Sequence, residues 1–514
     1  MRLRFMPLLM LLAGPAQAQQ LSEIPQGLRD ETPRWHALTG ARLVLAPGQV
    51  VDNGTLVMKD GVIVAAGAGV KAPAGARVWH LPGRTVYAGF IDAASGIGQG
   101  RIEPSRAKGL TPGQRWVRAE FRQAAALDIR PDELKAAREQ GFTTALSLPP
   151  AGAIFRGQSA LISLRDAVDA RSLVLAADVA QHVGHEYGVI DFEAGGRTGV
   201  VSYPTSLMGS IALVRQTWLN ARWAAGPQPA GERREFNAGL QALAPAAAGR
   251  QPVVHEALDE LDLARIARLR DEFGLQVIAQ GSGHEYRRAA QLKAQALPVI
   301  VPLAYPAAPE VEQPESALDV PLQVLQHWER APGNAAALQA AGVPFAISTQ
   351  GLKDVRKEFW PRLRQAVQRG LAPEAALAAL TTTPARLLGQ QRLGRLAPGQ
   401  LADVVVASGD LFTSEQAEVE LAFVDGQPLP TPAWERFDPR GTWTLQPADG
   451  PTQPWQIAGT RSRPTLQVDG QACELQQQGR ELLLRWPCAA GSTGRIASQR
   501  VSTGVAGSAA RASA

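Results

Sequence analysis

The chain has 514 residues, which is too long for one small core and predicts two or three domains. Apolar residues make up 45% of the sequence and charged residues 19%, proportions that are typical of a globular protein and argue against wholesale disorder. The formal net charge is only +5 and no basic run is long, so we expect no binding to nucleic acid.

The first 18 residues have the order of a secretory signal. Arg2 and Arg4 precede an apolar segment that is too short to span a bilayer, and a small-x-small cleavage site ends at Ala18. We expect cleavage after Ala18 and export, with a bacterial periplasm as the best fit; a buried helix of the mature domain is the alternative. No later stretch is apolar for about 18 residues, so we expect no transmembrane segment.

Short strands and turns fill residues 36–87. Three apolar runs, at 41–45, 55–58 and 62–66, are separated by Gly-containing turns, a pattern that predicts a small β-sandwich. The turn at Pro82-Gly83 then leads into a further apolar run that ends at Asp92. A run of this kind, bounded by turn residues, is typical of a buried strand in a parallel sheet.

Helical and strand patterns alternate between residues 88 and 389. We expect helices at 131–140, 258–273, 285–295 and 334–341, and strands at 143–148, 252–255, 275–279, 297–303 and 345–349. Repeated βα units with buried strands predict an α/β fold with a parallel sheet, and over this length a closed (β/α)8 barrel. An open, doubly wound sheet is the alternative, because periodicity does not show whether a sheet closes.

Residues 437–514 have a different texture, in which apolar and polar positions alternate as in antiparallel strands. This pattern predicts an appended all-β module. The sequence has two cysteines, Cys473 and Cys488, at a spacing that suits a disulfide across a hairpin in an oxidising compartment. Two free, buried thiols are the alternative.

Two motifs resemble those of a known family. Gly89-Phe90-Ile91-Asp92 resembles the segment that begins the barrel of amidohydrolases, and residues 393–406 (LGRLAPGQLADVVV) resemble the segment that follows it. The motifs lie far apart and in the family's order. The chain is therefore similar to the amidohydrolase superfamily, in particular to composite-domain metal-dependent hydrolases such as imidazolonepropionase and dihydroorotase. The resemblance implies a barrel over 88–389 and one β-sandwich shared by 36–87 and 390–430.

The resemblance also implies a catalytic metal at the carboxyl ends of the barrel strands. In the family a His-x-His pair follows the first strand, a carboxylated Lys comes from the fourth, and single histidines come from the fifth and sixth. In this chain Ala94 and Gly96 stand in place of the pair, and no lysine lies where the bridging one is expected. His255 occupies about the fifth-strand position, whereas Gln280 replaces the sixth-strand histidine.

The catalytic base of the family is an Asp after the eighth strand, and Gln350 stands in its place. An amide does not titrate in the working range, so Gln350 cannot serve as a base. A rebuilt zinc site is the alternative, formed by His182 and His185, on one predicted helix face, with His255 or His284. Without such a site we expect no cofactor, although Arg156, Gln158, Gln280 and Gln350 are polar and could bind a small neutral ligand.

Two hypotheses of function follow. By descent the chain is a hydrolase of non-peptide carbon–nitrogen bonds, but the replaced ligands favour a catalytically impaired protein or a binding pseudoenzyme. An active periplasmic amidohydrolase with a rebuilt metal site is the alternative. The sequence identifies neither a protein partner nor a substrate.

Overall fold

The computed structural model describes residues 34–100, 116–187, 203–227, 235–435, 440–446, 453–459, 464–468, 471–478, 481–484 and 510–511. The predicted signal peptide, residues 1–18, lies outside these ranges. The predicted disulfide does too, because Cys488 is outside them and only the backbone of Cys473 is described. No helix of the described part is both long and apolar enough to cross a membrane.

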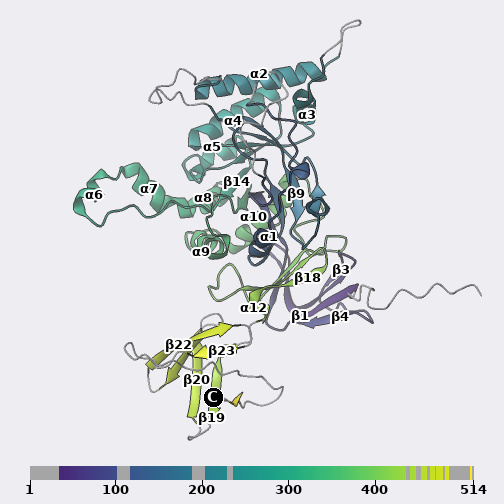
Figure 1. The fold of residues 1–514 in the computed structure, drawn as a ribbon, viewed down its shortest axis with the longest axis vertical. Helices are drawn as coiled ribbons and strands as arrows, with labels where there is room; N and C mark the ends of the chain where they lie inside the picture. The colour runs from purple at the N-terminus through teal and green to yellow at the C-terminus, as the bar shows by residue number, and fades with distance from the viewer. Residues whose placement is uncertain are drawn as a thin grey trace, which may run out of the picture.

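Strands from both ends of the predicted barrel segment form one eight-stranded sheet. Its order is β18-β17-β16-β5-β1-β2-β3, and β4 pairs with β1. The bounds are β1 Trp35–Ala46, β2 Gln49–Lys59, β3 Val62–Gly67, β4 Arg77–His80, β5 Thr85–Ala88, β16 Val404–Ala407, β17 Val419–Val424 and β18 Gln427–Pro430. The purple N-terminal strands and the light green later strands, among them β18, belong to this one sheet in Figure 1, and they pair through β5 and β16. The two segments thus join as predicted.

This sheet folds over a core of its own, in which Leu38, Met58 and Val86 pack with Val404 and Phe423. The sequence predicted a two-sheet sandwich, whereas the pairings record one sheet. Its two ends meet, because the turn after β2 contacts the turn after β17. A Cβ built on Gly61 would lie 2.6 Å from Oδ1 of Asp425, so the contact leaves room only for glycine.

The two motifs that carry the family resemblance touch each other. The amide of Gly89 donates to the carbonyl oxygen of Asp403 at 2.8 Å, and a Cβ on Gly89 would lie 2.1 Å from Oγ1 of Thr143. The Asp403 carboxylate accepts from Oγ1 of Thr144 at 3.2 Å and from the amide of Asp425 at 2.8 Å. Burial raises the pKa of Asp403 to about 6. The motifs therefore join the eight-stranded sheet to the strands that follow it.

Two further sheets carry the parallel strands. One has the order β10-β9-β7-β6 and the other β15-β14-β13-β12-β11-β8. The bounds are β6 Phe90–Ser95, β7 Phe142–Ser147, β8 Phe155–Gln158, β9 Ala160–Ser163, β10 Val174–Ala176, β11 Gln181–Val183, β12 Val253–Glu256, β13 Val277–Gln280, β14 Val299–Pro302 and β15 Phe345–Ser348. Strands β11 to β15 run parallel to one another, as do β6 and β7.

The two sheets approach each other at both edges. Strands β8 and β9 are separated only by Ser159, and they pair antiparallel with β11 and β7 respectively. At the other edge, the carboxylate of Asp92 in β6 accepts from the amide of Thr349, directly after β15, at 3.0 Å. Burial raises the pKa of Asp92 to about 6, against the opposing effect of the Thr349 hydrogen bonds.

Helices lie between most of the parallel strands. Their bounds are α1 Pro131–Arg138, α2 Leu207–Ala225, α3 Ala238–Ala247, α4 Glu260–Phe273, α5 Ala289–Ala294, α8 Asn334–Ala341, α9 Val355–Gln368, α10 Pro373–Leu380 and α11 Thr382–Leu387. Helix α4 begins at Asp259, whose side chain accepts from two backbone amides, and ends at Gly274 with φ of +55°. The predicted helix at 285–295 is broken into a 3-10 turn, Glu285–Arg287, and α5.

The strands β12 to β15 have two distinct faces. Val254, Ile278, Ile300 and Ala346 share one apolar cluster with residues of β6, β7 and β9, and we call this the inner face. The alternate residues of the same strands, such as Val253, belong to the larger cluster that includes the helices, and we call this the outer face. Which face a side chain occupies decides whether it can meet the residues at the other strand ends.

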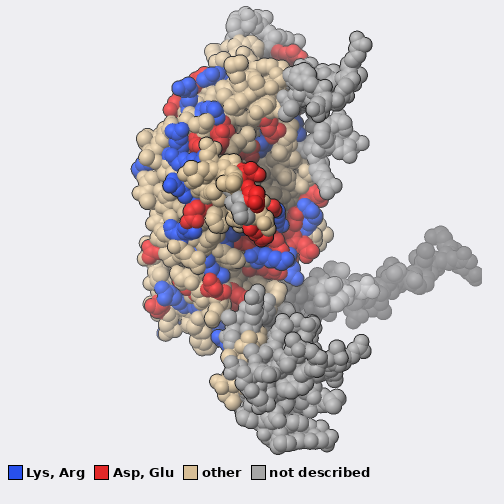
Figure 2. All heavy atoms as spheres, turned by 90° about the vertical axis from the view of Figure 1, so that its left-hand side faces the viewer, with Lys and Arg blue, Asp and Glu red and all other residues tan. Residues whose placement is uncertain are grey.

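Two helices project from this body at the left of Figure 1, α6 Pro314–Asp319 and α7 Leu322–Arg330. On the face shown in Figure 2, basic and acidic side chains are interspersed, without an extended track of one sign. Beyond α12 (Pro432–Glu435) the chain forms antiparallel strands β19 to β23, with β24 paired parallel to β19. Their bounds are Gly441–Gln446, Gln453–Gly459, Pro464–Val468, Gln471–Gln478, Glu481–Leu484 and Ala510–Arg511.

Candidate functional site

Two amides meet at the carboxyl ends of β13 and β15. Nε2 of Gln280 donates to Oε1 of Gln350 at 2.5 Å, and only 3% of Gln280 is exposed. These are two of the positions at which the sequence analysis placed degenerate family residues, and the structure brings them together. The pair is neutral and mutually hydrogen-bonded, so neither amide supplies a base or an anionic metal ligand.

An arginine lies beside them, held between two carboxylates. Glu256, the last residue of β12, lies opposite Gln280 in the strand register, and its side chain is on the inner face. The guanidinium of Arg156 contacts Glu256 and forms an ion pair of 2.8 Å with Glu186. Burial lowers the pKa of Arg156, but the attraction of Glu256 and Glu186 outweighs it and the net shift is upward. A Cβ on Gly184 would lie 2.7 Å from this guanidinium, so glycine makes room for it.

Arg156 was expected from the sequence to be a binding residue, but the two glutamates that hold it were not. The only local signal for them is their position, since Glu186 directly follows His185 and Glu256 directly follows His255. Glu256 rather than His255 thus stands beside Gln280 on the inner face. The fixed charge at these strand ends is that of a guanidinium and two carboxylates.

His255 faces the outer side, which corrects the prediction that it keeps a family ligand position. Its neighbour Val254 belongs to the inner face, and alternation along β12 directs His255 outward. Nε2 of His255 lies 3.1 Å from Nε2 of His185, whose Nδ1 lies 3.3 Å from Oδ1 of Asp262 on α4. These three side chains form a buried chain of polar groups that links β12 to α4.

The hydrogen bonds of these three side chains run from Asp262 to His255. The Asp262 carboxylate accepts from Nδ1–H of His185, and the Nε2 atoms of His185 and His255 share one hydrogen bond. Burial lowers the pKa of His255 well below its ordinary value, and the neighbouring His185 lowers it further. Burial raises the pKa of Asp262, but hydrogen bonds from His185, the amide of Leu258 and Arg265 outweigh it and the net shift is downward.

Of the histidines proposed for a rebuilt zinc site, His185 and His255 meet, but the described residues do not bring together the three ligands that zinc needs. His182 lies on strand β11, not on the predicted helix, and pairs in register with Val254. It is buried, its Nε2 has no hydrogen-bond partner, and burial followed by the charge of Arg156 lowers its pKa to about 3. His284 stacks on His327 with ring centroids 3.7 Å apart. Within the described residues no three His, Cys, Asp or Glu side chains are arranged to hold a metal ion.

The first-strand positions offer no ligand either. Ala94 is fully buried, and a Cβ built on Gly96 would meet no heavy atom within 4 Å. The carboxylate of the same strand, Asp92, accepts from the amide of Ala94 at 3.4 Å and from Thr349. Gln158 was also expected to be a binding residue. Its Oε1 accepts from the side-chain Nε2 of Gln251 at 3.1 Å, so its hydrogen bond is separate from that between Gln280 and Gln350.

Known proteins support the family in two ways. The family model described as "Amidohydrolase family" matches residues 330–429. The structure of an amidohydrolase from Thermotoga maritima MSB8 is similar with a TM-score of 0.61 and 19% identity, over 77% of this chain and 99% of that one. Molinate hydrolase and a triazine hydrolase variant have TM-scores of 0.44 and 0.43, at 15% and 16% identity, over 77% of this chain and 95% of each.

No curated protein matches the chain in sequence. At 19% identity the Thermotoga maritima structure shows the fold alone, an α/β architecture with a composite domain. The family model adds a match in sequence over the segment that contains Gln350 and the second motif. Together these findings confirm the resemblance of this chain to the amidohydrolase superfamily, in sequence over residues 330–429 and in fold over 77% of its length.

Proposed function

We propose that this chain is a binding protein built on an amidohydrolase fold, without the metal-dependent hydrolysis of carbon–nitrogen bonds. The observation that carries the proposal is the side-chain set at the inner-face strand ends. There Arg156 is paired with Glu186 and Glu256, and Gln280 is bonded to Gln350. Metal-dependent hydrolysis needs a cation that acidifies a bound water and a base that takes its proton, and this set offers neither function.

In our proposal the two sheets with parallel strands are arcs of one closed barrel. Two contacts support closure: the continuity of β8 and β9 through Ser159, and the hydrogen bond from Thr349 to Asp92 across the other edge. The segment formed by β8 and β9 is then antiparallel to its neighbours β11 and β7, so the barrel is not parallel throughout. In such a barrel the strand ends form a mouth, where ligands bind.

The residues present do not fit the family's metal. Ala94 and Gly96 carry no donor atom, an amide such as Gln280 is a poor ligand for a transition metal, and His255 is directed to the outer face. The guanidinium of Arg156 would repel a divalent cation placed beside Glu256. The proposed function therefore involves no metal-dependent step.

The groups at the strand ends favour a small, neutral, polar ligand. Gln280 and Gln350 supply amide donors and acceptors, and the low pKa of His182 leaves its ring neutral. The two carboxylates that hold Arg156 more than offset its charge, so this guanidinium offers no unpaired positive charge to an anionic ligand. A cyclic amide or imide offers the complementary donors and acceptors, and ancestry in an amidohydrolase fold is consistent with this class.

The test combines metal analysis, turnover and binding. We expect less than stoichiometric zinc in the purified protein and no hydrolysis of hydantoin or glycinamide, with or without added zinc or manganese. Hydantoin should nevertheless raise the thermal midpoint, and the double substitution Gln280→Leu with Gln350→Leu should abolish this rise, since it removes the amides without changing charge.

Arg395→Gln, an exposed position, is the matched control and should keep the hydantoin response. One tightly bound zinc per chain, removed by chelator together with activity, would contradict the proposal. So would a thermal midpoint that hydantoin leaves unchanged in the native chain.

We also propose export, with the signal cleaved after Ala18 and Cys473 joined to Cys488. The ordered basic, apolar and small-residue regions at the N-terminus and the paired cysteines support it. The intact mass of the periplasmic protein, measured with and without a thiol-alkylating reagent, tests both points. A retained N-terminus or two alkylated thiols would contradict them.

A further inference from the structure

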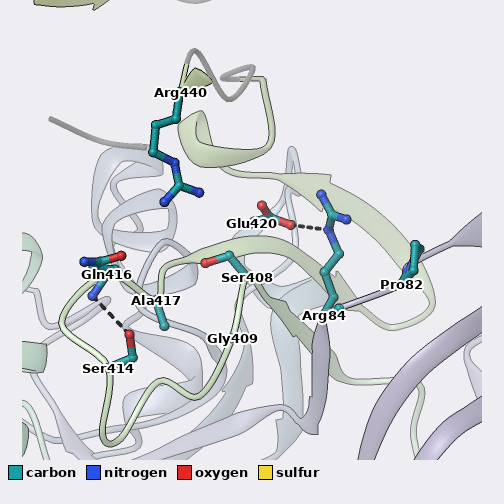
Figure 3. A pocket seen from close by; sticks show the side chains of 10 residues that line it. Pro82, Arg84, Ser408, Gly409, Ser414, Gln416, Ala417, Glu420 and Arg440 are labelled. Carbon is teal, nitrogen blue, oxygen red and sulfur yellow. Dashed lines mark hydrogen bonds and ion pairs between the residues drawn. The ribbon is translucent and has the colours of Figure 1, made fainter. Parts of the chain in front are cut away.

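A polar pocket of about 310 Å³ lies on the eight-stranded sheet, outside the strand ends discussed above. Figure 3 shows it between the turn before β5, the loop after β16 and the segment that leads into β19. Its described lining includes two guanidinium groups and one carboxylate, from Arg84, Arg440 and Glu420. The charged groups that line the pocket therefore sum to one positive charge.

A turn fixes the direction of Arg84. The amide of Arg84 donates to the carbonyl oxygen of Leu81 at 3.3 Å, and Gly83 has φ of +74°. Pro82 and Gly83 are the residues preferred at the two central positions of a type II turn, the second of which needs a positive φ. The sequence of the turn thus places Arg84 at the start of β5, beside β16 and the buried Glu420.

Glu420 anchors Arg84 and leaves donors over. Its carboxylate, 1% exposed, accepts from Nε of Arg84 at 2.6 Å. This bond uses one of the five N–H donors of the Arg84 guanidinium. In Figure 3 the Arg440 guanidinium points toward the hollow from the side opposite Arg84, with Glu420 between them.

A neutral side chain adds a further donor to the lining of the pocket. Oγ of Ser414 accepts from the amide of Gln416 at 3.3 Å, so its proton is left to donate. Ser408 also lines the pocket, but its Oγ accepts from the amide of Glu418 at 3.0 Å and donates to the carbonyl oxygen of Glu418 at 3.5 Å, so it adds no donor. Hydroxyl and guanidinium donors around a positively charged hollow are the chemistry that recognises an oxyanion.

We propose that this pocket binds a small oxyanion, either a free carboxylate or a phosphate. The anion would bridge Arg84 of the eight-stranded sheet and Arg440, the residue before β19, and so tie the C-terminal strands to the sheet. The site is separate from the one in the proposed function and does not depend on it.

Titration calorimetry of the full chain with succinate and with inorganic phosphate tests the proposal, with chloride at equal ionic strength as the blank. Heat with succinate alone assigns a carboxylate, heat with phosphate alone assigns a phosphate, and heat with both assigns the shared oxyanion chemistry. Arg440→Gln should weaken binding about tenfold to a hundredfold, the effect of one lost charge-assisted contact.

Arg84→Gln alone would leave the buried carboxylate of Glu420 unpaired, so the informative variant combines it with Glu420→Gln. This pair keeps the local charge balanced and should also lose binding. Arg395→Gln, an arginine that lines another surface pocket, is the matched control and should bind as the native chain does. The proposal is overturned if neither anion gives heat, or if Arg440→Gln binds as tightly as the control.

Discussion

The last two residues of strand β12, His255 and Glu256, lie on opposite faces and have different surroundings. On the inner face Glu256 meets Arg156, and both side chains keep some exposure, 22% and 9%. On the outer face His255 is sealed against His185, and Asp262 completes the chain at 3% exposure. One of two adjacent residues thus belongs to a charged cluster that solvent reaches, and the other to a buried hydrogen-bonded chain. We call this chain, made of His255, His185 and Asp262, the outer brace.

The comparison separates a residue's type from its role. Histidine at the end of a strand in an amidohydrolase fold suggests a metal ligand, yet here it braces a strand against α4. The side chain that does reach the neighbouring strand ends is a glutamate, and it is matched by an arginine. Position on the face, set by a shift of one residue, decides between these roles.

The largest expected effect is on the inner face. Arg156→Met leaves Glu186 and Glu256 facing each other without their cation, and we expect a loss of about 3 to 5 kcal/mol in stability, as when one partner of a buried ion pair is removed. The drop in thermal midpoint measures it. Adding Glu186→Gln and Glu256→Gln should recover most of the loss. A drop that persists in this charge-balanced variant would show that the stem of Arg156, not its charge, is what matters.

A second prediction concerns the edge where β15 meets β6. Burial raises the pKa of Asp92 to about 6, so the stability that this carboxyl contributes is fully present below its ordinary pKa and is lost as pH rises through 6. The shift of about two units corresponds to about 3 kcal/mol. Asp92→Asn should remove this part of the pH dependence between pH 4 and 7, seen in thermal midpoints of both proteins. Parallel curves for the two proteins would rule out the assignment.

The outer brace should respond less strongly. Asp262→Asn removes the charged acceptor of His185 and Arg265, and we expect a loss of about 2 kcal/mol at pH 7. The pKa of Asp262 is lowered on folding, so its contribution is present above its ordinary pKa and disappears as pH falls. The difference between variant and native midpoints should therefore shrink in acid. If it stays constant with pH, the effect is one of shape and not of charge.

The smallest effect is expected at Gln350. Gln350→Asp restores the side chain of the family's base, and Gln280 can still donate to it, so stability should change by less than about 1 kcal/mol. We expect neither zinc binding nor hydrolysis of hydantoin, because Ala94, Gly96 and Gln280 still provide no suitable metal ligand. Metal analysis and turnover of this variant measure both. Any zinc-dependent activity would show that one substitution separates the chain from a hydrolase.

Much of the architecture could be predicted from the sequence. The alternation of helix and strand patterns located α8 at its observed bounds and β15 within one residue. The two motifs predicted that residues on either side of the central segment join, and they do. These features follow from local sequence patterns, namely apolar runs, turn glycines and helix caps.

The direction of β8 and β9 could not be predicted in the same way. Each has four residues, and a short buried run looks the same whichever way it pairs. The face of His255 was equally hidden, because Pro252-Val253-Val254 is apolar on both sides and shows no alternation. Only the register with β13 and the clusters on each side resolve it.

The strand order of the eight-stranded sheet also determines how the sheet can assemble during translation. Strand β5 pairs with β1, close by in sequence, and with β16, whose residues are synthesised only after every strand and helix in between. During translation β5 therefore presents an open edge, which invites pairing with other chains. The sheet is completed last although it begins first, and a chaperone that shields this edge would act on the nascent N-terminal strands.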